Sequence, residues 1–145
     1  SNTSSVALYH TTHTNFNTKI INISGKTKEY FMLENIGHDG YQAGLDYIIG
    51  GNDNTSGIAI WHIDDNQSGN YDYNHKLVDL EEAADAGLDL GTHSGKQTNL
   101  FFSGNKTEFS DSTDPNSKTY SGTSSGITID NISAAGDSMT FDVTF

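Results

Sequence analysis

The residues best suited to binding a metal ion begin at Asp64. The stretch reads Asp-Asp-Asn-Gln-Ser-Gly, so Asp64, Asn66 and Ser68 place oxygen atoms at the first, third and fifth positions of a calcium-binding loop. The twelfth position, where such a loop carries a bidentate glutamate, is His75. An irregular calcium site would need another acid: Asp72, or the later residues Asp79, Glu81, Glu82 and Asp85. Because Asp, Asn and Gly are also typical of ordinary turns, both interpretations stay open.

His62 is the histidine whose sequence environment suggests a specific role. It lies in the apolar segment Gly57–Asp64, so we expect a buried imidazole, which needs hydrogen-bond partners. Glu34 and Asn35 end another apolar segment and are the partners that we predict. Glu34, Asn35 and His62 would then form a buried polar network with a structural role. The catalytic alternative combines His62 and Glu34 with Asp64.

Two tyrosines in the acidic loop are candidates for ligand binding. Tyr71 and Tyr73 flank Asp72, where we expect their rings to be exposed, and an exposed ring can stack on the apolar face of a sugar. Trp61 lies inside an apolar segment and is expected in the core. Tyr71 and Tyr73 are therefore the ligand-binding residues that a glycan- or protein-binding module would use.

Composition argues against several other functions. The chain has 7 Lys and Arg against 19 Asp and Glu, and its net charge of −12 repels nucleic acid and anionic lipid. The absence of cysteine excludes disulfides, thiolate catalysis and cysteine-based zinc sites. The sequence contains no His-Glu-x-x-His motif, the spacing that binds zinc in many peptidases, and no apolar run long enough to span a membrane. We predict neither a nucleic-acid partner nor a membrane span.

Short strands separated by polar turns must position these side chains. Alternating apolar and polar residues predict strands at Ser5–Tyr9, Lys19–Ile23, Lys28–Asn35, Asp46–Ile49, Gly57–Asp64, Gly126–Ile132 and Ser138–Phe145. Segment Lys76–Asp85 favours a short helix by its Leu, Glu and Ala content but also permits a strand. We therefore predict an all-β fold, or a β-rich one with one short helix, arranged as an antiparallel β-sandwich of jelly-roll or immunoglobulin-like type. Because no repeat or linker is visible, residues 1–145 are expected to form one domain.

Two of these segments carry more specific predictions. Asp46–Ile49 and Gly57–Asp64 are separated by a Gly- and Asn-rich turn, which predicts a hairpin with a long tip. In the last strand the apolar residues occupy every second position, which predicts one buried face and one wet face. The residues of that buried face are Met139, Phe141, Val143 and Phe145.

Several segments resemble the region that follows the catalytic domain in M6 metallopeptidases, the immune inhibitor A family. They are Glu29–Asn35, Gly57–Asp64, Val78–Ala83, Pro115–Ser117, Tyr120–Gly122 and Ser125–Ile127. The series covers most of the chain in the same order, and its most specific parts are the Trp-His-Ile-Asp element and the strand ending in Glu-Asn. The chain departs from the family pattern at Ile36, where an Arg is usual, and at Gly91–Gln97, where the family has an acidic stretch.

The resemblance implies a noncatalytic accessory domain, residues 1–145, of a larger secreted bacterial zinc peptidase. Zinc would belong to the catalytic domain of that parent protein, which would also be this domain's partner and act on protein substrates, whereas calcium could bind this domain. The first residues, Ser1 to Thr3, lack an initiator methionine and agree with a mature product or a piece of a longer chain. The alternative is a free-standing extracellular module that binds glycans or proteins.

Overall fold

A computed structural model describes residues 2–10, 17–37, 56–84, 87–92 and 95–145. These residues form seven strands and one 3₁₀ helix, η2 (Gln97–Asn99). The strands are β1 (Thr3–Tyr9), β2 (Thr18–Asn22), β3 (Glu29–Ile36), β4 (Gly57–Asp64), β5 (Val78–Leu80), β6 (Thr128–Asp130) and β7 (Ser138–Thr144). No helix in this part of the chain is both long enough and apolar enough to cross a membrane.

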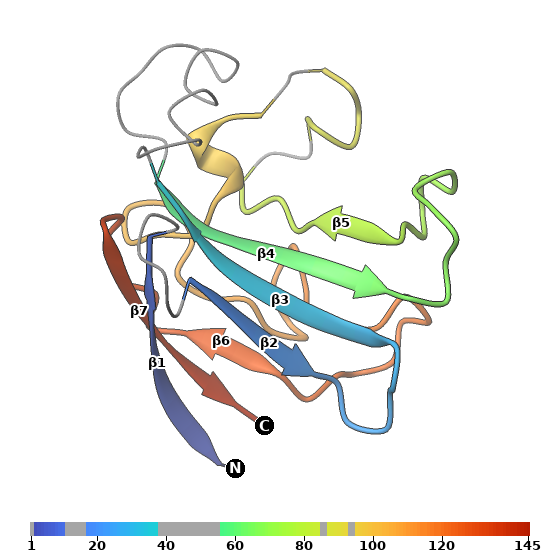
Figure 1. Ribbon diagram of the computed structural model, residues 1–145, viewed down its shortest axis with the longest axis horizontal. Helices are drawn as coiled ribbons and strands as arrows, with labels where there is room; N and C mark the ends of the chain where they lie inside the picture. Colours follow the sequence, from blue (N-terminus) through green and yellow to red (C-terminus); the bar gives the residue numbers. More distant parts are fainter. Residues whose placement is uncertain (1, 11–16, 38–55, 85–86, 93–94) are drawn as a thin grey trace.

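The strands form two antiparallel sheets that pack as a β-sandwich (Figure 1). One sheet has the order β1-β7-β6, and the other has the order β2-β3-β4-β5. The predicted all-β sandwich is therefore confirmed. Its strands are short and the connections between β5 and β6 are long, as expected from a sequence rich in Ser, Thr, Asn and Gly.

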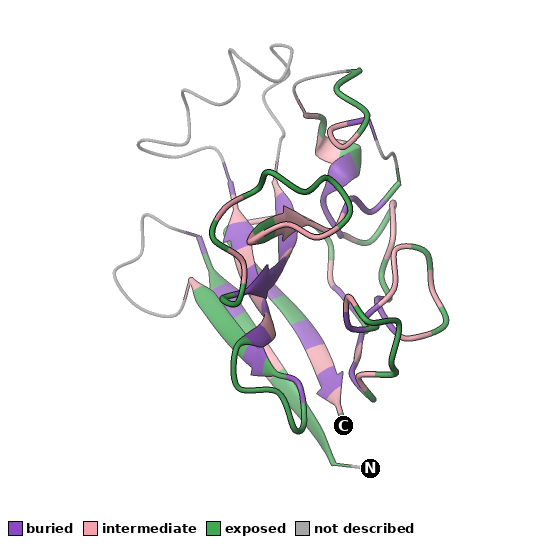
Figure 2. Cartoon of the chain, turned by 90° about the vertical axis from the view of Figure 1, so that its right-hand side faces the viewer, coloured by how far each residue is buried: buried purple, intermediate pink, exposed green. Residues whose placement is uncertain are grey.

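The core lies between the inner faces of the two sheets (Figure 2). In β3 burial alternates residue by residue, so Phe31 and Leu33 point into the core while Met32 points away from it. The β7 residues Met139, Phe141 and Val143 are almost fully buried and face them from the other sheet. These inner faces are apolar at their centre and polar at the two ends of β3.

Asn35 joins the two sheets at one end of the core. Its side chain is fully buried, and its amide donates to the backbone carbonyl oxygens of Leu8 at 3.2 Å and of Gly136 at 3.1 Å. Leu8 belongs to β1, and Gly136 lies in the turn before β7. Asn35 therefore links β3 to the other sheet rather than to His62.

The structure resolves or corrects several local predictions. In the predicted segment Lys76–Asp85, the described residues 76–84 contain strand β5 and no helix, because Val78–Leu80 pairs with β4. Trp61 is only half-buried, since its position in β4 faces away from the core. Phe145 follows the end of β7 and is 57% exposed, so the predicted buried face ends at Val143. The predicted strand Asp46–Ile49 lies outside the described residues.

Candidate functional site

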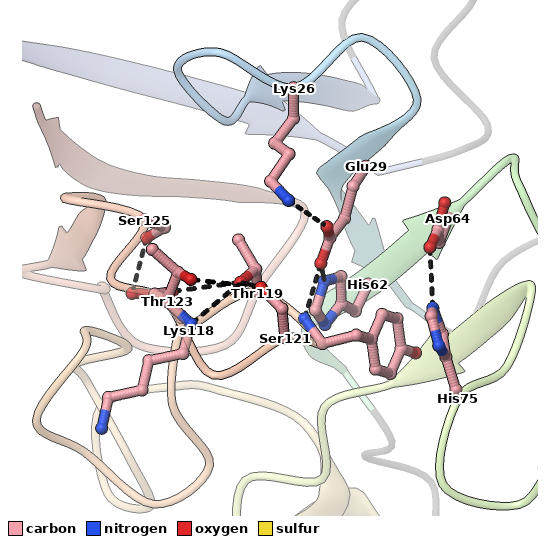
Figure 3. Close-up of polar contacts among 12 residues, drawn as sticks. Lys26, Glu29, His62, Asp64, His75, Lys118, Thr119, Ser121, Thr123 and Ser125 are labelled. Carbon is pink, nitrogen blue, oxygen red and sulfur yellow. Dashed lines mark hydrogen bonds and ion pairs between the residues drawn. The ribbon is translucent and has the colours of Figure 1, made fainter.

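The most organised polar group of the structure surrounds His62, which is only 3% exposed. Its Nε2 atom lies 3.1 Å from Oε1 of Glu29 (Figure 3). Its Nδ1 atom lies 3.2 Å from Oε1 of Glu81. Tyr120 stacks on the imidazole, with 4.1 Å between ring centroids and 12° between planes. We call these four residues, Glu29, His62, Glu81 and Tyr120, the His62 cluster.

Strand pairing explains why the carboxylates of Glu29 and Glu81 both contact the His62 imidazole. His62 pairs with Phe31, and Glu29 lies two residues before Phe31, so Glu29 shares the inner face. Glu81 follows β5 directly, and its backbone N–H donates to the carbonyl oxygen of Ile60 at 2.9 Å. That bond continues the pairing beside β4 and holds Glu81 next to His62.

The hydrogen bonds leave the imidazole no free nitrogen. A carboxylate only accepts hydrogen bonds, so both contacts form together when His62 carries two N–H groups, as the imidazolium does. Burial raises the pKa of the Glu81 carboxyl, although the hydrogen bond with His62 opposes that rise. A protonated Glu81 would donate to a neutral ring in the alternative arrangement. In either state both nitrogens are engaged, so His62 has no lone pair available to act as a base.

Tyr120 closes the cluster on the side of the long loops. Its backbone N–H donates to Oε1 of Glu29 at 2.7 Å, and the second face of its ring stacks on His75 at 4.2 Å. Burial raises the pKa of the Tyr120 hydroxyl, and the nearby charges of Asp79 and Glu81 raise it further. The hydroxyl oxygen is buried and has no partner in hydrogen-bond geometry. The nearby backbone of Lys76 lowers the pKa of the hydroxyl, but less than burial and the carboxylates raise it.

Asp64 belongs to a second, separate pair beside the His62 cluster. Its Oδ2 atom lies 2.7 Å from Nε2 of His75, and its Oδ1 atom accepts from the backbone N–H of Asn66 at 3.0 Å and from its side-chain amide at 2.7 Å. Burial disfavours ionisation of Asp64, but these bonds outweigh it and hold its pKa below the ordinary value. Both carboxylate oxygens are therefore engaged by nitrogen groups.

This arrangement defines what a calcium ion would meet in the loop after β4. Asp64 and Asn66 are brought together, but a cation would have to compete with Asn66 and His75 for the oxygens of Asp64. Asp72 accepts from the backbone N–H of Asn74 at 2.9 Å, and Ser68 is exposed. In the described part of the chain no three His, Asp or Glu residues are grouped so as to hold a metal ion. Calcium at Asp64, Asn66, Ser68 and Asp72 stays a prediction.

Asp111 holds the loop that delivers Tyr120. It accepts from the backbone N–H groups of Ser125 at 3.0 Å and Gly126 at 3.1 Å, and from the hydroxyls of Ser117 and Ser124. Burial disfavours its ionisation, but these bonds outweigh it and lower the pKa of Asp111. Figure 3 shows the neighbouring run of hydroxyl side chains from Thr119 to Ser125.

Residues Gly122–Gly126 match the letters of a Gly-x-Ser-x-Gly nucleophile elbow, with Ser124 in the position of the nucleophile. The structural context of such an elbow is a sharp turn from a strand into a helix, whereas these residues form an irregular loop. Ser124 is exposed, and its hydroxyl donates to Asp111 instead of to a histidine. The match therefore identifies a structural loop.

Two hollows adjoin the His62 cluster. The first, of about 430 Å³, is lined by His62, Glu81, Asp114, Pro115, Asn116, Lys118, Thr119, Tyr120 and Gly122. The second, of about 260 Å³, shares Glu81, Asp114 and Pro115 with it, and its further charged residues are Asp79, Glu82, Asp89 and Lys106. Lys76 forms ion pairs with Asp79 and Asp89. Carboxylates outnumber cations among the lining residues, so both hollows favour positively charged ligands over negatively charged ones.

The predicted polar network of Glu34, Asn35 and His62 does not form, because neither Glu34 nor Asn35 is a partner of His62. Glu34 pairs with Ala59 on the outer face of the sheet, and it accepts from Nε1 of Trp61 at 3.4 Å. Asn35 is on the inner face but pairs with Ile58, four residues from His62. The predicted catalytic group of His62, Glu34 and Asp64 fails for the same reason, because Glu34 lies on the opposite side of the sheet.

The exposure predicted for the two loop tyrosines is confirmed. Tyr71 is 93% exposed and Tyr73 is 54% exposed. The ammonium group of Lys76 lies 5.3 Å from the centre of the Tyr73 ring. Their use in ligand binding stays a prediction.

Comparison with known proteins adds no relative. No protein-family model, no curated protein and no solved structure matches the chain. The resemblance to M6 metallopeptidases therefore rests on the quoted sequence segments alone.

Proposed function

We propose that this chain is a noncatalytic structural domain of a secreted M6-like zinc metallopeptidase. The observation that supports the proposal is the origin of the His62 cluster. Glu29, His62, Glu81 and Tyr120 come from four of the separate segments that resemble the family. Segments far apart in the chain thus supply one side chain each to the same buried contact, which supports a structural role for the segments that carry the resemblance.

The geometry of the cluster favours a structural role over catalysis. A catalytic imidazole needs a nitrogen within reach of a substrate, and both nitrogens of His62 are held by carboxylates. Its ring is covered by Tyr120 on one side and lies 4.5 Å from the Phe31 ring centroid. These contacts fix the ends of β3, β4 and β5 and the long loop around one residue.

Incubation of the purified chain with casein, with and without added zinc, tests the noncatalytic role. We expect no cleavage in either condition. Zinc-dependent cleavage that disappears in His62→Ala, while the variant remains folded, would refute it.

A second candidate function is a free-standing glycan-binding module, which the exposure of Tyr71 and Tyr73 favours. A glycan array separates the two candidates. Binding that is lost in Tyr71→Ala but kept in Tyr9→Ala, an exposed tyrosine on the other sheet, would support the glycan module. Absence of binding to any glycan would exclude it.

A further inference from the structure

The chain contains a single proline, Pro115, and it follows an aspartate. An Asp–Pro peptide bond is chemically weaker than other peptide bonds, because the aspartate carboxylate can attack the carbonyl carbon of its own residue and close a cyclic anhydride. The departing nitrogen is the secondary amine of proline, which leaves readily once it is protonated. In an unfolded chain at neutral pH the reaction is slow, so a fold that uses it must supply further groups. The Asp114–Pro115 bond lies in an irregular loop beside both hollows.

The Asp114 carboxylate is free to act as the nucleophile. Asp114 is exposed, and within the described part of the chain its side chain makes no hydrogen bond or ion pair. Asp111, earlier in the same loop, differs because its carboxylate accepts from the backbone N–H groups of Ser125 and Gly126 and is held in place. The nucleophile and the carbonyl carbon belong to one residue, so no second molecule has to be positioned for the attack.

Lys106 contacts the atom that gains negative charge in such an attack. Its ammonium group donates to the main-chain carbonyl oxygen of Asp114, which is the oxygen of the Asp114–Pro115 bond. A hydrogen-bond donor at this oxygen stabilises the tetrahedral intermediate of acyl transfer more than the starting amide. An ammonium group can also supply the proton that the leaving nitrogen needs. Lys106 therefore lies where both an oxyanion donor and an acid are required.

The loop 110–117 holds the bond on both sides. The Thr113 hydroxyl donates to the carbonyl oxygen of Pro115 at 2.7 Å. The backbone N–H of Ser117 donates to the carbonyl oxygen of Ser110 at 2.9 Å, and both serines are buried. Because Lys106 reaches the bond only through the fold of this loop, unfolding removes its contact.

We infer that the chain cleaves its own Asp114–Pro115 bond, with Lys106 as the group that activates it. A carboxylate oxygen of Asp114 bonds to the main-chain carbonyl carbon of Asp114, and the carbonyl oxygen takes the negative charge beside the Lys106 ammonium. When this intermediate collapses, the bond from the carbon to the Pro115 nitrogen breaks, and that nitrogen takes a proton from Lys106. Water then opens the cyclic anhydride and leaves two carboxylates on Asp114. Of the two protons released, one returns to Lys106 and the other goes to the Pro115 amine.

The cleaved chain would stay assembled. The C-terminal fragment carries β6 and β7, and β7 lies between β1 and β6 and pairs with β1 along its length (Figure 1). The backbone N–H of Tyr120 also holds Glu29 across the cut. Cleavage would therefore be visible only after denaturation. The reaction occurs once in each chain and acts on no other protein, so it is independent of the proposed function.

Mass spectrometry of the purified chain, incubated at neutral pH with protease inhibitors and then denatured, tests the inference. We expect fragments 1–114 and 115–145 to accumulate in the folded chain but not in a sample kept in concentrated urea. Asp114→Ala removes the nucleophile and should abolish cleavage. Lys106→Ala should slow cleavage about tenfold, which is less than the loss of about 10²–10³ for an enclosed oxyanion donor because Lys106 is only half-buried.

Lys118→Ala is the matched control and should leave the rate unchanged, because Lys118 lines the first hollow with Asp114 but it is Lys106 that donates to the bond. The three substituted side chains lie outside the core, so each variant is expected to keep the wild-type melting temperature. A chain that stays intact when folded would overturn the inference. Equal rates in the folded and urea-treated chain, or an unchanged rate in Lys106→Ala, would also overturn it, since either shows only the ordinary weakness of an Asp–Pro bond.

Discussion

Replacing His62 with alanine tests whether the His62 cluster holds the fold together. The change removes the imidazole whose two nitrogens contact Glu29 and Glu81, whose side chains are 7% and 15% exposed. Removing one partner of a buried hydrogen bond costs about 1–3 kcal/mol, because the remaining polar group stays buried without its partner. Glu29 keeps its bond from the Tyr120 backbone and its contact with Lys26 at 3.5 Å, so most of the loss falls on Glu81.

The magnitude follows from these contacts. We expect about 2–3 kcal/mol from the buried Glu81 side chain that loses its hydrogen-bond partner, and about 1 kcal/mol more from the lost stacking on Tyr120. For a chain of this size a loss of about 3–4 kcal/mol lowers the melting temperature by roughly 10 °C or more. Urea denaturation monitored by the fluorescence of the single tryptophan, Trp61, measures the free energy of unfolding directly.

His75→Ala is the matched control, because His75 also pairs with a carboxylate and stacks on Tyr120. Its side chain is 35% exposed and contacts one carboxylate, so we expect a loss of about 1 kcal/mol. A loss below 1 kcal/mol for His62→Ala, or a gain in stability, would refute the structural role. A gain would instead indicate a residue kept for activity at the expense of stability.

Three further changes test other parts of the structure. Asp111→Asn should lower the free energy of unfolding by about 1–2 kcal/mol at pH 7. The folded state lowers the pKa of Asp111 below its ordinary 3.8. The stabilisation by the ionised carboxylate is therefore present above pH 3.8 and is lost as the pH falls through the pKa of the folded state. Acid titration of unfolding should therefore show wild type and variant converging as the pH falls below 3.8, and a constant difference at all pH values would contradict the charge-based cause. Asn35→Leu should cost about 1–3 kcal/mol in urea denaturation, because buried carbonyls of the opposite sheet lose their donor; an unchanged midpoint would rule out that link. Millimolar calcium should raise the wild-type melting temperature but not that of Asp64→Ala if the predicted ion binds, and an unchanged wild-type temperature would remove calcium from the proposal.

The fold was accessible from the sequence because the hydrophobic pattern is a local property. The period of two in β7 and the apolar runs of β3 and β4 depend only on neighbouring residues, and these patterns correctly predicted strands there. The same pattern could not tell which face of β4 is the core side, so Trp61 was predicted inside. The residues before and after Trp61 in β4 are apolar on both faces of the strand. Only the strand pairing and the position of the second sheet decide which face of β4 lies in the core.

The candidate site was less accessible because its contacts depend on register. His62 was correctly expected to be buried and hydrogen-bonded, yet its partners are fixed by the pairing of Phe31 with His62 and not by chemical type. Glu29 and Asn35 both share the parity of Phe31, so parity narrows the candidates but only the register brings Glu29 to His62. Tyr120 reaches the ring through an irregular loop held by Asp111, for which the sequence offers no periodic signal.

The coding sequence upstream of Ser1 tests the central claim most directly. If this chain is a noncatalytic domain of an M6-like peptidase, the same reading frame encodes a His-Glu-x-x-His motif before it, within a domain that cleaves casein when zinc is bound. A reading frame that contains this domain without any zinc-binding catalytic domain would contradict the claim and favour the free-standing binding module.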